Sequence, residues 1–122
     1  MKRVLLIEDH ALFRESLALL LEWRLGLESV EAGSLAEGRR VLSAVEGMAD
    51  FAIIDLDLPD GDGSELIERL RQVEPEVPIL AFTGNPSLTR RARALEAGAD
   101  EVLAKMTPVE QIIGAAEQLV GG

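Results

Sequence analysis

The feature that most constrains the fold is a regular alternation of short apolar runs with longer segments of helical periodicity. The apolar runs are rich in β-branched residues and read as buried strands. Each is followed by a segment whose apolar side chains recur every three or four residues. Five such units in series predict an α/β fold, a doubly wound parallel sheet with helices on both faces. The predicted strands are Val4–Ile7, Ser29–Ala32, Phe51–Ile54, Ile79–Phe82 and Glu101–Ala104.

Helix-start signals separate the strands from the helical segments. Serine, threonine, aspartate and asparagine accept hydrogen bonds from the first free backbone N–H groups of a helix, and proline suits its first position. On this basis Asn85 is the predicted cap of the fourth helix, with Pro86 opening it, and Asp62 caps the third. The predicted helices are His10–Leu25, Ser34 to about Val45, Asp62–Val73, Pro86 to near Gly98, and the segment after Thr107-Pro108, with capping boxes Ser34/Glu37, Asp62/Glu65 and Thr107/Glu110.

Composition excludes several classes of protein. The 122 residues suffice for one domain with a hydrophobic core. A net charge of −10 argues against direct binding of DNA or RNA, which needs clustered Lys and Arg. There is no cysteine, and no apolar run reaches the length of a membrane span. We therefore expect a cytoplasmic domain that contacts neither nucleic acid nor membrane.

Polar side chains stand just past four of the five predicted strands. Glu8 and Asp9 follow the first strand, Asp55 the third, Thr83 the fourth and Lys105 the fifth. Ligands of doubly wound sheets bind at the carboxyl ends of the strands. Because those ends share one edge of the sheet, we expect three acids, a hydroxyl and a lysine to converge there. Any one acid at a strand end is commonly just a solvated loop residue, so the joint placement carries the prediction.

This set of residue types suits phosphoryl transfer. Carboxylates held close together repel one another unless a cation joins them, and an oxygen-only set suits Mg²⁺. A carboxylate can itself be the nucleophile and form an aspartyl-phosphate. Lys105 offers a charge for phosphate oxygens and Thr83 a hydroxyl donor. We therefore predict that Asp55 is phosphorylated. The single histidine, His10, is expected to start a helix rather than to bind a ligand.

Four motifs, in order and spread over the whole chain, resemble the receiver domain of two-component response regulators. They are "LLIEDHALFRESL", "IIDLDLPDGDG", "AFTG" and "GADEVLAK". The "DHALFR" start and the lysine followed by "MTPVEQI" are most similar to regulators with a LuxR-type helix-turn-helix output domain. The resemblance implies a flavodoxin-like (βα)5 fold with strand order 2-1-3-4-5. It also implies one receiver domain over residues 1–122, either standing alone or belonging to a longer regulator whose output domain is absent from this chain.

The resemblance also implies roles for individual residues. Asp55 matches the residue that accepts a phosphoryl group from a sensor histidine kinase or a phosphotransfer protein. Mg²⁺ would be held by Glu8, Asp9, Asp55 and the main-chain carbonyl of Asp57. Thr83 and Lys105 match the residues that contact the phosphoryl group and convert its presence into movement. The matching positions that tune the rate of dephosphorylation are Asp57 and Asn85.

Two alternatives come from other functional classes, although we expect a protein that is not an enzyme. "IIDLDLP" also resembles the haloacid dehalogenase phosphatase motif, in which Asp55 would be the nucleophile and Asp57 the acid/base. That family carries this motif on its first strand, whereas here it lies on the third. The second alternative is a receiver-like interaction module that is never phosphorylated. The intact set of five site residues argues against it.

Two surface features allow competing interpretations. Leu12, Leu19 and Trp23 flank the core stripe of the first helix. We expect them to complete packing against a neighbouring helix; the competing hypothesis is an exposed edge that docks the kinase. Arg90, Arg91 and Arg93 in the fourth helix are expected to form a solvated face. The competing hypothesis there is a homodimer after phosphorylation, with pairing to Glu101 or Glu117.

Overall fold

A five-stranded parallel sheet forms the centre of the computed structural model, which describes residues 2–44, 49–85 and 87–121. Its strand order is β2-β1-β3-β6-β7. Counted along the chain without the short hairpin strands β4 and β5, this is the predicted order 2-1-3-4-5, which is confirmed. The strands are β1 (Arg3–Ile7), β2 (Glu28–Ala32), β3 (Phe51–Asp55), β6 (Ile79–Thr83) and β7 (Glu101–Ala104).

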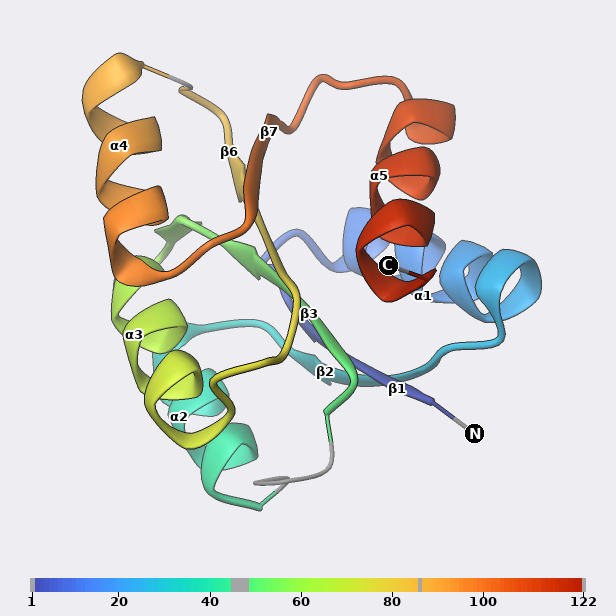
Figure 1. The fold of residues 1–122 in the computed structure, drawn as a ribbon, viewed down its shortest axis with the longest axis horizontal. Coiled ribbons are helices and arrows are strands. Elements are labelled where there is room, and N and C mark those ends of the chain that lie inside the picture. Colours follow the sequence, from blue (N-terminus) through green and yellow to red (C-terminus); the bar gives the residue numbers. More distant parts are fainter. Residues whose placement is uncertain (1, 45–48, 86, 122) are drawn as a thin grey trace.

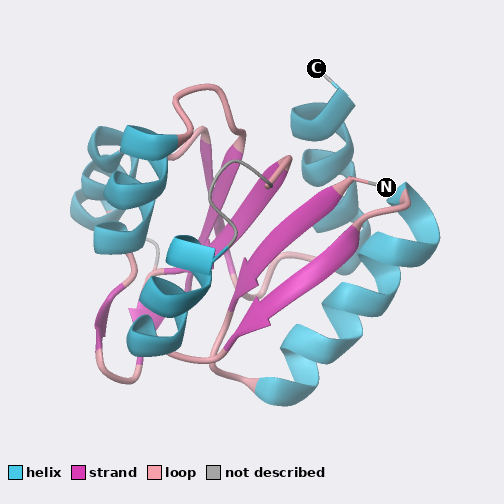
Figure 2. Ribbon diagram, turned by 90° about the horizontal axis from the view of Figure 1, so that it is seen from below, coloured by secondary structure: helices cyan, strands magenta, loops and turns pink. Residues whose placement is uncertain are grey.

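Helices cover both faces of the sheet, as Figures 1 and 2 show. Helices α1 and α5 lie against one face and α2, α3 and α4 against the other. This is the predicted doubly wound arrangement. The helices are α1 (Ala11–Leu25), α2 (Leu35–Ala44), α3 (Ser64–Val73), α4 (Leu88–Ala97) and α5 (Val109–Gly121).

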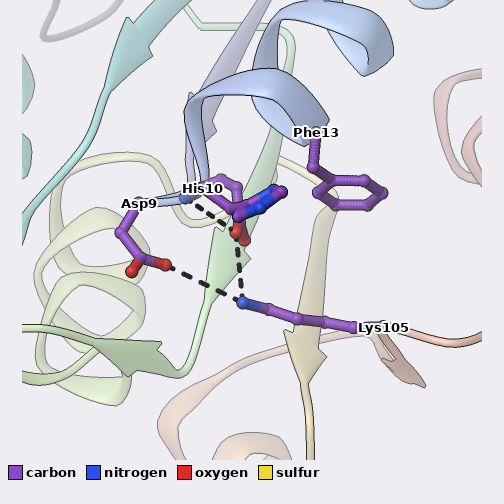
Figure 3. A pocket seen from close by; sticks show the side chains of 5 residues that line it. Asp9, His10, Phe13 and Lys105 are labelled. Atoms are coloured by element: carbon purple, nitrogen blue, oxygen red, sulfur yellow. Dashed lines mark hydrogen bonds and ion pairs between the residues drawn. The ribbon is translucent and has the colours of Figure 1, made fainter.

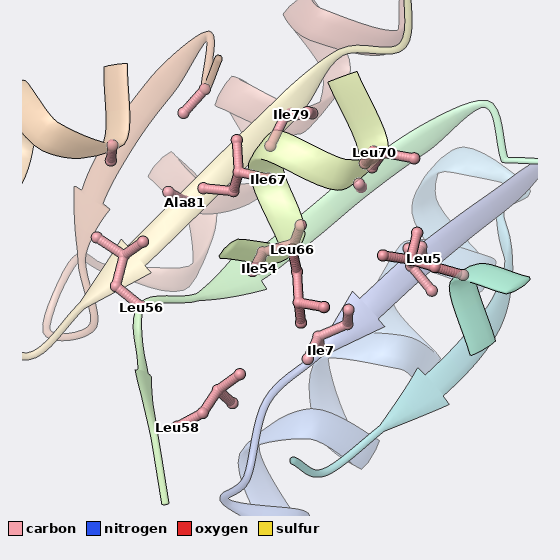
Figure 4. Packing of buried hydrophobic residues seen from close by; sticks show 14 of the residues in the cluster. Leu5, Ile7, Ile54, Leu56, Leu58, Leu66, Ile67, Leu70, Ile79 and Ala81 are labelled. Carbon is pink, nitrogen blue, oxygen red and sulfur yellow. The ribbon is translucent and has the colours of Figure 1, made fainter. Parts of the chain in front are cut away.

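The core consists of two apolar layers, one on each face of the sheet. All five residues of β3 are buried, because this strand is central and covered on both faces. Figure 4 shows the layer beneath α3, in which Leu66 and Ile67 pack against Ile54 and Ile7. The same strand ends at Asp55, so the position of that carboxylate is set by a strand that is buried over its whole length.

The predicted helix starts are partly right. The Ser34 hydroxyl accepts from the Glu37 N–H at 3.1 Å, as predicted, and His10 occupies the cap position of α1. The prediction for Asn85 is wrong. Helix α4 begins at Leu88, and its cap is Ser87, whose hydroxyl accepts from the Arg90 N–H. The proline expected to open that helix lies outside the described residues, as does the expected end of α2.

The prediction that Asp62 caps the third helix is right only in part: its carboxylate accepts from the N–H of Ser64, the first residue of α3, at 2.9 Å, but Asp62 does not hold the cap position. Gly63 holds the cap position of α3, while Asp62 belongs to a short hairpin of β4 (Asp57–Leu58) and β5 (Gly61–Asp62) that the sequence did not predict. At its turn, the carboxylate of Asp60 accepts from the N–H groups of Leu35 and Ala36 at 2.7 and 3.0 Å. The hairpin therefore caps α2 from a distance in sequence, and these bonds lower the pKa of Asp60.

Candidate functional site

The carboxyl ends of β1, β3 and β7 bring the predicted acids and lysine together. Lys105, just after β7, donates from Nζ to Asp55 Oδ2 at 2.8 Å and to Glu8 Oε1 at 3.1 Å. The same nitrogen lies 3.8 Å from Asp9 Oδ1, as Figure 3 shows for these two side chains. Lys105 is 50 residues from Asp55 and 97 from Glu8, so only the sheet topology makes this cluster.

Two of the three carboxylates are buried. Asp55 is 0% exposed and Glu8 2%, whereas Asp9 lies at the surface. Burial raises the pKa of Asp55 from 3.8 to about 7, against the lowering effect of hydrogen bonds from Lys105 and from the Asp57 N–H. Burial pulls the pKa of Lys105 down, but its bonds to Asp55 and Glu8 outweigh that and hold the pKa above 10.5. The lysine therefore supplies a permanent positive charge beside Asp55.

The three carboxylates fit a hard metal ion. One oxygen from each of Glu8, Asp9 and Asp55 lies within 4.8 Å of the others. The second oxygen of Glu8, Oε2, is buried and accepts no hydrogen bond from the described residues. A buried carboxylate oxygen without a donor is costly, and a cation would satisfy it. The all-oxygen set is the kind that Mg²⁺ takes.

An open hollow lies directly over this cluster. Its volume is about 380 Å³, and it is lined by Glu8, Asp9, His10, Phe13 and Lys105. Figure 3 shows the Phe13 ring at its side, and that ring packs edge-on against Phe82 with centroids 6.0 Å apart. The hollow leaves room for a small group beside Glu8, Asp9 and Lys105.

Thr83 lies at the same sheet edge, but its hydroxyl faces another partner. It donates to Asp57 Oδ2 at 3.0 Å, and the Gly84 N–H donates to the same oxygen at 2.7 Å. The other oxygen of Asp57 accepts from Arg90 Nη2. Only the backbone N–H of Asp57 contacts the acidic cluster among its described contacts: it donates to Asp55 Oδ1 at 2.8 Å. The two aspartates are two residues apart in the sequence, but their carboxylates have different partners: Lys105 for Asp55, and Thr83, Gly84 and Arg90 for Asp57.

Two residues of this site were missed by the sequence analysis. Arg90, expected on a solvated face, reaches Asp57 and also donates from Nε to the Thr83 hydroxyl at 3.3 Å. Gly63 was given no role in the sequence analysis. A Cβ placed there would lie 2.1 Å from the main-chain oxygen of Asp55, so only glycine fits beneath the end of β3. The sequence "GDGSE" contains this glycine, but nothing in it indicates a contact with the distant end of β3.

The first surface expectation is wrong, and the second is right in part. Leu12, Leu19 and Trp23 remain 73%, 69% and 79% exposed, so they do not complete the packing of α1. Of the α4 arginines, Arg91 and Arg93 are exposed as expected, whereas Arg90 is half-buried. The two exposed arginines also have partners: Arg91 donates to the main-chain oxygen of Val102 at 2.9 Å, and Arg93 pairs with Asp62 at 3.3 Å. Asn85 is exposed, and its backbone N–H donates to the Thr83 hydroxyl at 3.1 Å.

Known proteins share this arrangement. The family model described as the response regulator receiver domain matches residues 4–117. The chain is 35% identical over 118 residues to the transcriptional regulatory protein PhoP of Escherichia coli strain K12. That match covers 97% of this chain and 52% of the relative, so the chain spans about half the length of the curated relatives it matches.

Solved structures resemble the chain over nearly all its length. One is a response regulator from Burkholderia pseudomallei with a phosphorylated aspartic acid, calcium ion and citrate. It has a TM-score of 0.82 and 34% identity, covering 94% of this chain and 66% of that one. Another is a two-component response regulator of the LuxR family from Aurantimonas sp. SI85-9A1. Its TM-score is 0.85 at 31% identity, covering 98% of this chain and 85% of that one. Among the described residues, no helix combines the length and apolar character needed to cross a membrane.

Proposed function

The chain belongs to the response regulator receiver domain family, and on that premise we propose that Asp55 is its phosphoacceptor. The observation that supports this best is the buried Asp55 carboxylate at the tip of β3, held 2.8 Å from Lys105 and beside two further carboxylates. Receiver domains act with histidine kinases and phosphotransfer proteins, so the donor is a phosphohistidine. One oxygen of Asp55 bonds to phosphorus as the P–N bond breaks, and that bond's electron pair leaves with the imidazole nitrogen.

The residues around Asp55 have separate parts in this proposal. The positive charge of Lys105 would lie beside the attacking carboxylate and would then neutralise charge on the phosphoryl oxygens. Glu8, Asp9, Asp55 and the main-chain carbonyl of Asp57 would hold Mg²⁺, which supplies neutralisation of phosphoryl charge when bound. The Thr83 hydroxyl would contact the phosphoryl group and carry the change to its loop.

The phosphatase alternative does not fit the site. An acid/base residue would have to face the reacting atoms beside Asp55. The Asp57 carboxylate instead bonds Thr83, Gly84 and Arg90. We propose instead that phosphorylation of this chain controls an output domain or a partner.

We further propose that the exposed edge of α1, made of Leu12, Leu19 and Trp23, docks the kinase. This edge begins at Leu12 in the first turn of α1, next to Phe13 at the side of the hollow, and exposed tryptophan and leucine side chains are typical of a docking surface. Homodimerisation on phosphorylation remains a second proposal. Its polar contacts would have to compete with the partners that Arg90, Arg91 and Arg93 already have within the chain.

Intact mass measured after incubation with acetyl phosphate and Mg²⁺ tests the proposed function. The parent chain should gain the mass of one phosphoryl group, and Asp55→Asn should gain none. The matched control is Asp57→Asn, which changes the neighbouring aspartate to the same amide and should still gain it. A mass gain that persists in Asp55→Asn, or is lost only in Asp57→Asn, would overturn the assignment of Asp55.

A further inference from the structure

The hydroxyl of Thr83 is fully occupied by partners other than Asp55. A hydroxyl has one proton to donate and two lone pairs to accept with. Thr83 is 0% exposed and donates its proton to Asp57 Oδ2 at 3.0 Å. It accepts from the Asn85 N–H at 3.1 Å and from Arg90 Nε at 3.3 Å. No hydrogen-bonding capacity is left for a group bound at Asp55.

Arg90 closes these contacts into a ring. Its guanidinium donates to Thr83 through Nε and to Asp57 Oδ1 through Nη2, so it fixes the carboxylate that takes the threonine proton. Arg90 lies in the first turn of α4, where its own N–H bonds the cap Ser87. The pair is about two-thirds buried, with the Arg90 and Asp57 side chains 33% and 36% exposed. Charge-assisted bonds in such surroundings are stronger than fully exposed ones.

We propose that Asp57 and Arg90 form a latch that holds the Thr83 hydroxyl away from Asp55 and that phosphorylation has to open. This rests on the proposed function, because it concerns the phosphorylated site. One hydroxyl proton cannot serve both Asp57 and a phosphoryl oxygen, so the two compete for it. The free energy of the latch is then subtracted from the affinity for the phosphoryl group. By the same linkage, opening it frees Arg90 and with it the first turn of α4.

The effect of Arg90→Ala on the affinity for a phosphoryl mimic has opposite signs under the latch and under electrostatic attraction alone. Arg90→Ala removes a positive charge near an anion site, so electrostatics alone predicts weaker binding of a phosphoryl mimic. Release of the latch predicts tighter binding instead. We expect tightening of about fivefold, which corresponds to roughly 1 kcal/mol for one partly exposed charge pair.

Titration with beryllium fluoride, a phosphoryl mimic, in the presence of Mg²⁺ provides the test. Binding is followed by the NMR signal of the Gly84 amide, which donates to Asp57. Arg90→Ala and Arg90→Gln should both bind more tightly than the parent chain. Adding Asp57→Ala to Arg90→Ala should not exceed the larger single effect, because both changes open one latch. Without Mg²⁺ or mimic, Arg90→Ala should also speed hydrogen exchange of the Gly84 amide.

The matched control is Arg93→Ala, which removes the same charge from the same helix. Arg93 is 69% exposed and pairs with Asp62 rather than with the latch, so its loss should weaken mimic binding slightly or leave it unchanged. If the parent binds the mimic but Arg90→Ala binds it equally or less well, the latch is wrong and the proposed function stands. If the parent does not bind it, or Asp55→Asn binds it equally, the proposed function fails and the latch with it.

Discussion

Replacing Asp55 by asparagine is expected to stabilise the folded chain, by an amount that depends on pH. The carboxylate is 0% exposed, and burial raises its pKa from 3.8 to about 7. Between these two pH values the folded state keeps a proton that the unfolded chain has already lost. Because the folded state binds more protons there, the free energy of unfolding falls as pH rises from about 4 to about 7.

The size of this effect follows from the same two pKa values. At 1.36 kcal/mol for each tenfold change, ionising Asp55 in the folded state costs about 4 kcal/mol at pH 8. That is a large share of the 5–15 kcal/mol by which domains are commonly stable. Asparagine is nearly isosteric and cannot ionise, so Asp55→Asn should recover up to about 4 kcal/mol at pH 8 and little at pH 4.

Urea unfolding of parent and variant at pH 4.5, 6, 7 and 8, without Mg²⁺, measures this difference. Every other group titrates in both chains, so the difference between them isolates Asp55. Asp9→Asn is the control, since it removes one charge from the same cluster at an exposed side chain. A gain that stays constant across the pH range, or that Asp9→Asn reproduces with the same pH dependence, would refute the argument from burial.

Three further predictions concern the metal, the lifetime of the phosphorylated state and the docking surface. Mg²⁺ at ten times its Kd should stabilise the parent by about 1.4 kcal/mol, which is measured as a higher melting temperature. The same concentration should stabilise Asp55→Asn less. Equal shifts of the melting temperature would show that Asp55 is not a ligand of the ion. Asp57→Ala should leave phosphorylation of Asp55 intact while changing the rate of dephosphorylation several-fold, roughly 1 kcal/mol in the barrier. The measurement is the decay of the phosphorylated mass over time, and identical decay curves for parent and variant would show that the Asp57 carboxylate has no effect on dephosphorylation. Trp23→Ala should slow phosphoryl transfer from a histidine kinase with the circular dichroism spectrum unchanged; an unchanged rate would remove the docking proposal.

The sequence predicted the parts of the fold that are set by local pattern. Continuous apolar runs located the strands within a residue or two, and strand ends located Glu8, Asp55 and Lys105 at one edge. Contacts between distant segments could not be read in this way. Ser87 rather than Asn85 caps α4 because the helix starts later than the Asn-Pro pair suggested. Trp23 was expected to pack against a neighbouring helix but is 79% exposed, because the position of a residue on a helical wheel does not show how far the next helix extends along it.

The end of β3 explains how two aspartates so close in sequence come to separate roles. In a continued strand, Asp55 and Asp57 would lie on the same face, two like charges side by side. The strand instead stops at Asp55, and the chain turns into the β4–β5 hairpin, with Gly63 packed against the Asp55 carbonyl. Each carboxylate then meets its own cation, Lys105 for Asp55 and Arg90 for Asp57. The backbone N–H of Asp57 still donates to Asp55, so a change at the proposed phosphoacceptor would reach the residue whose carboxylate bonds Thr83 and Arg90.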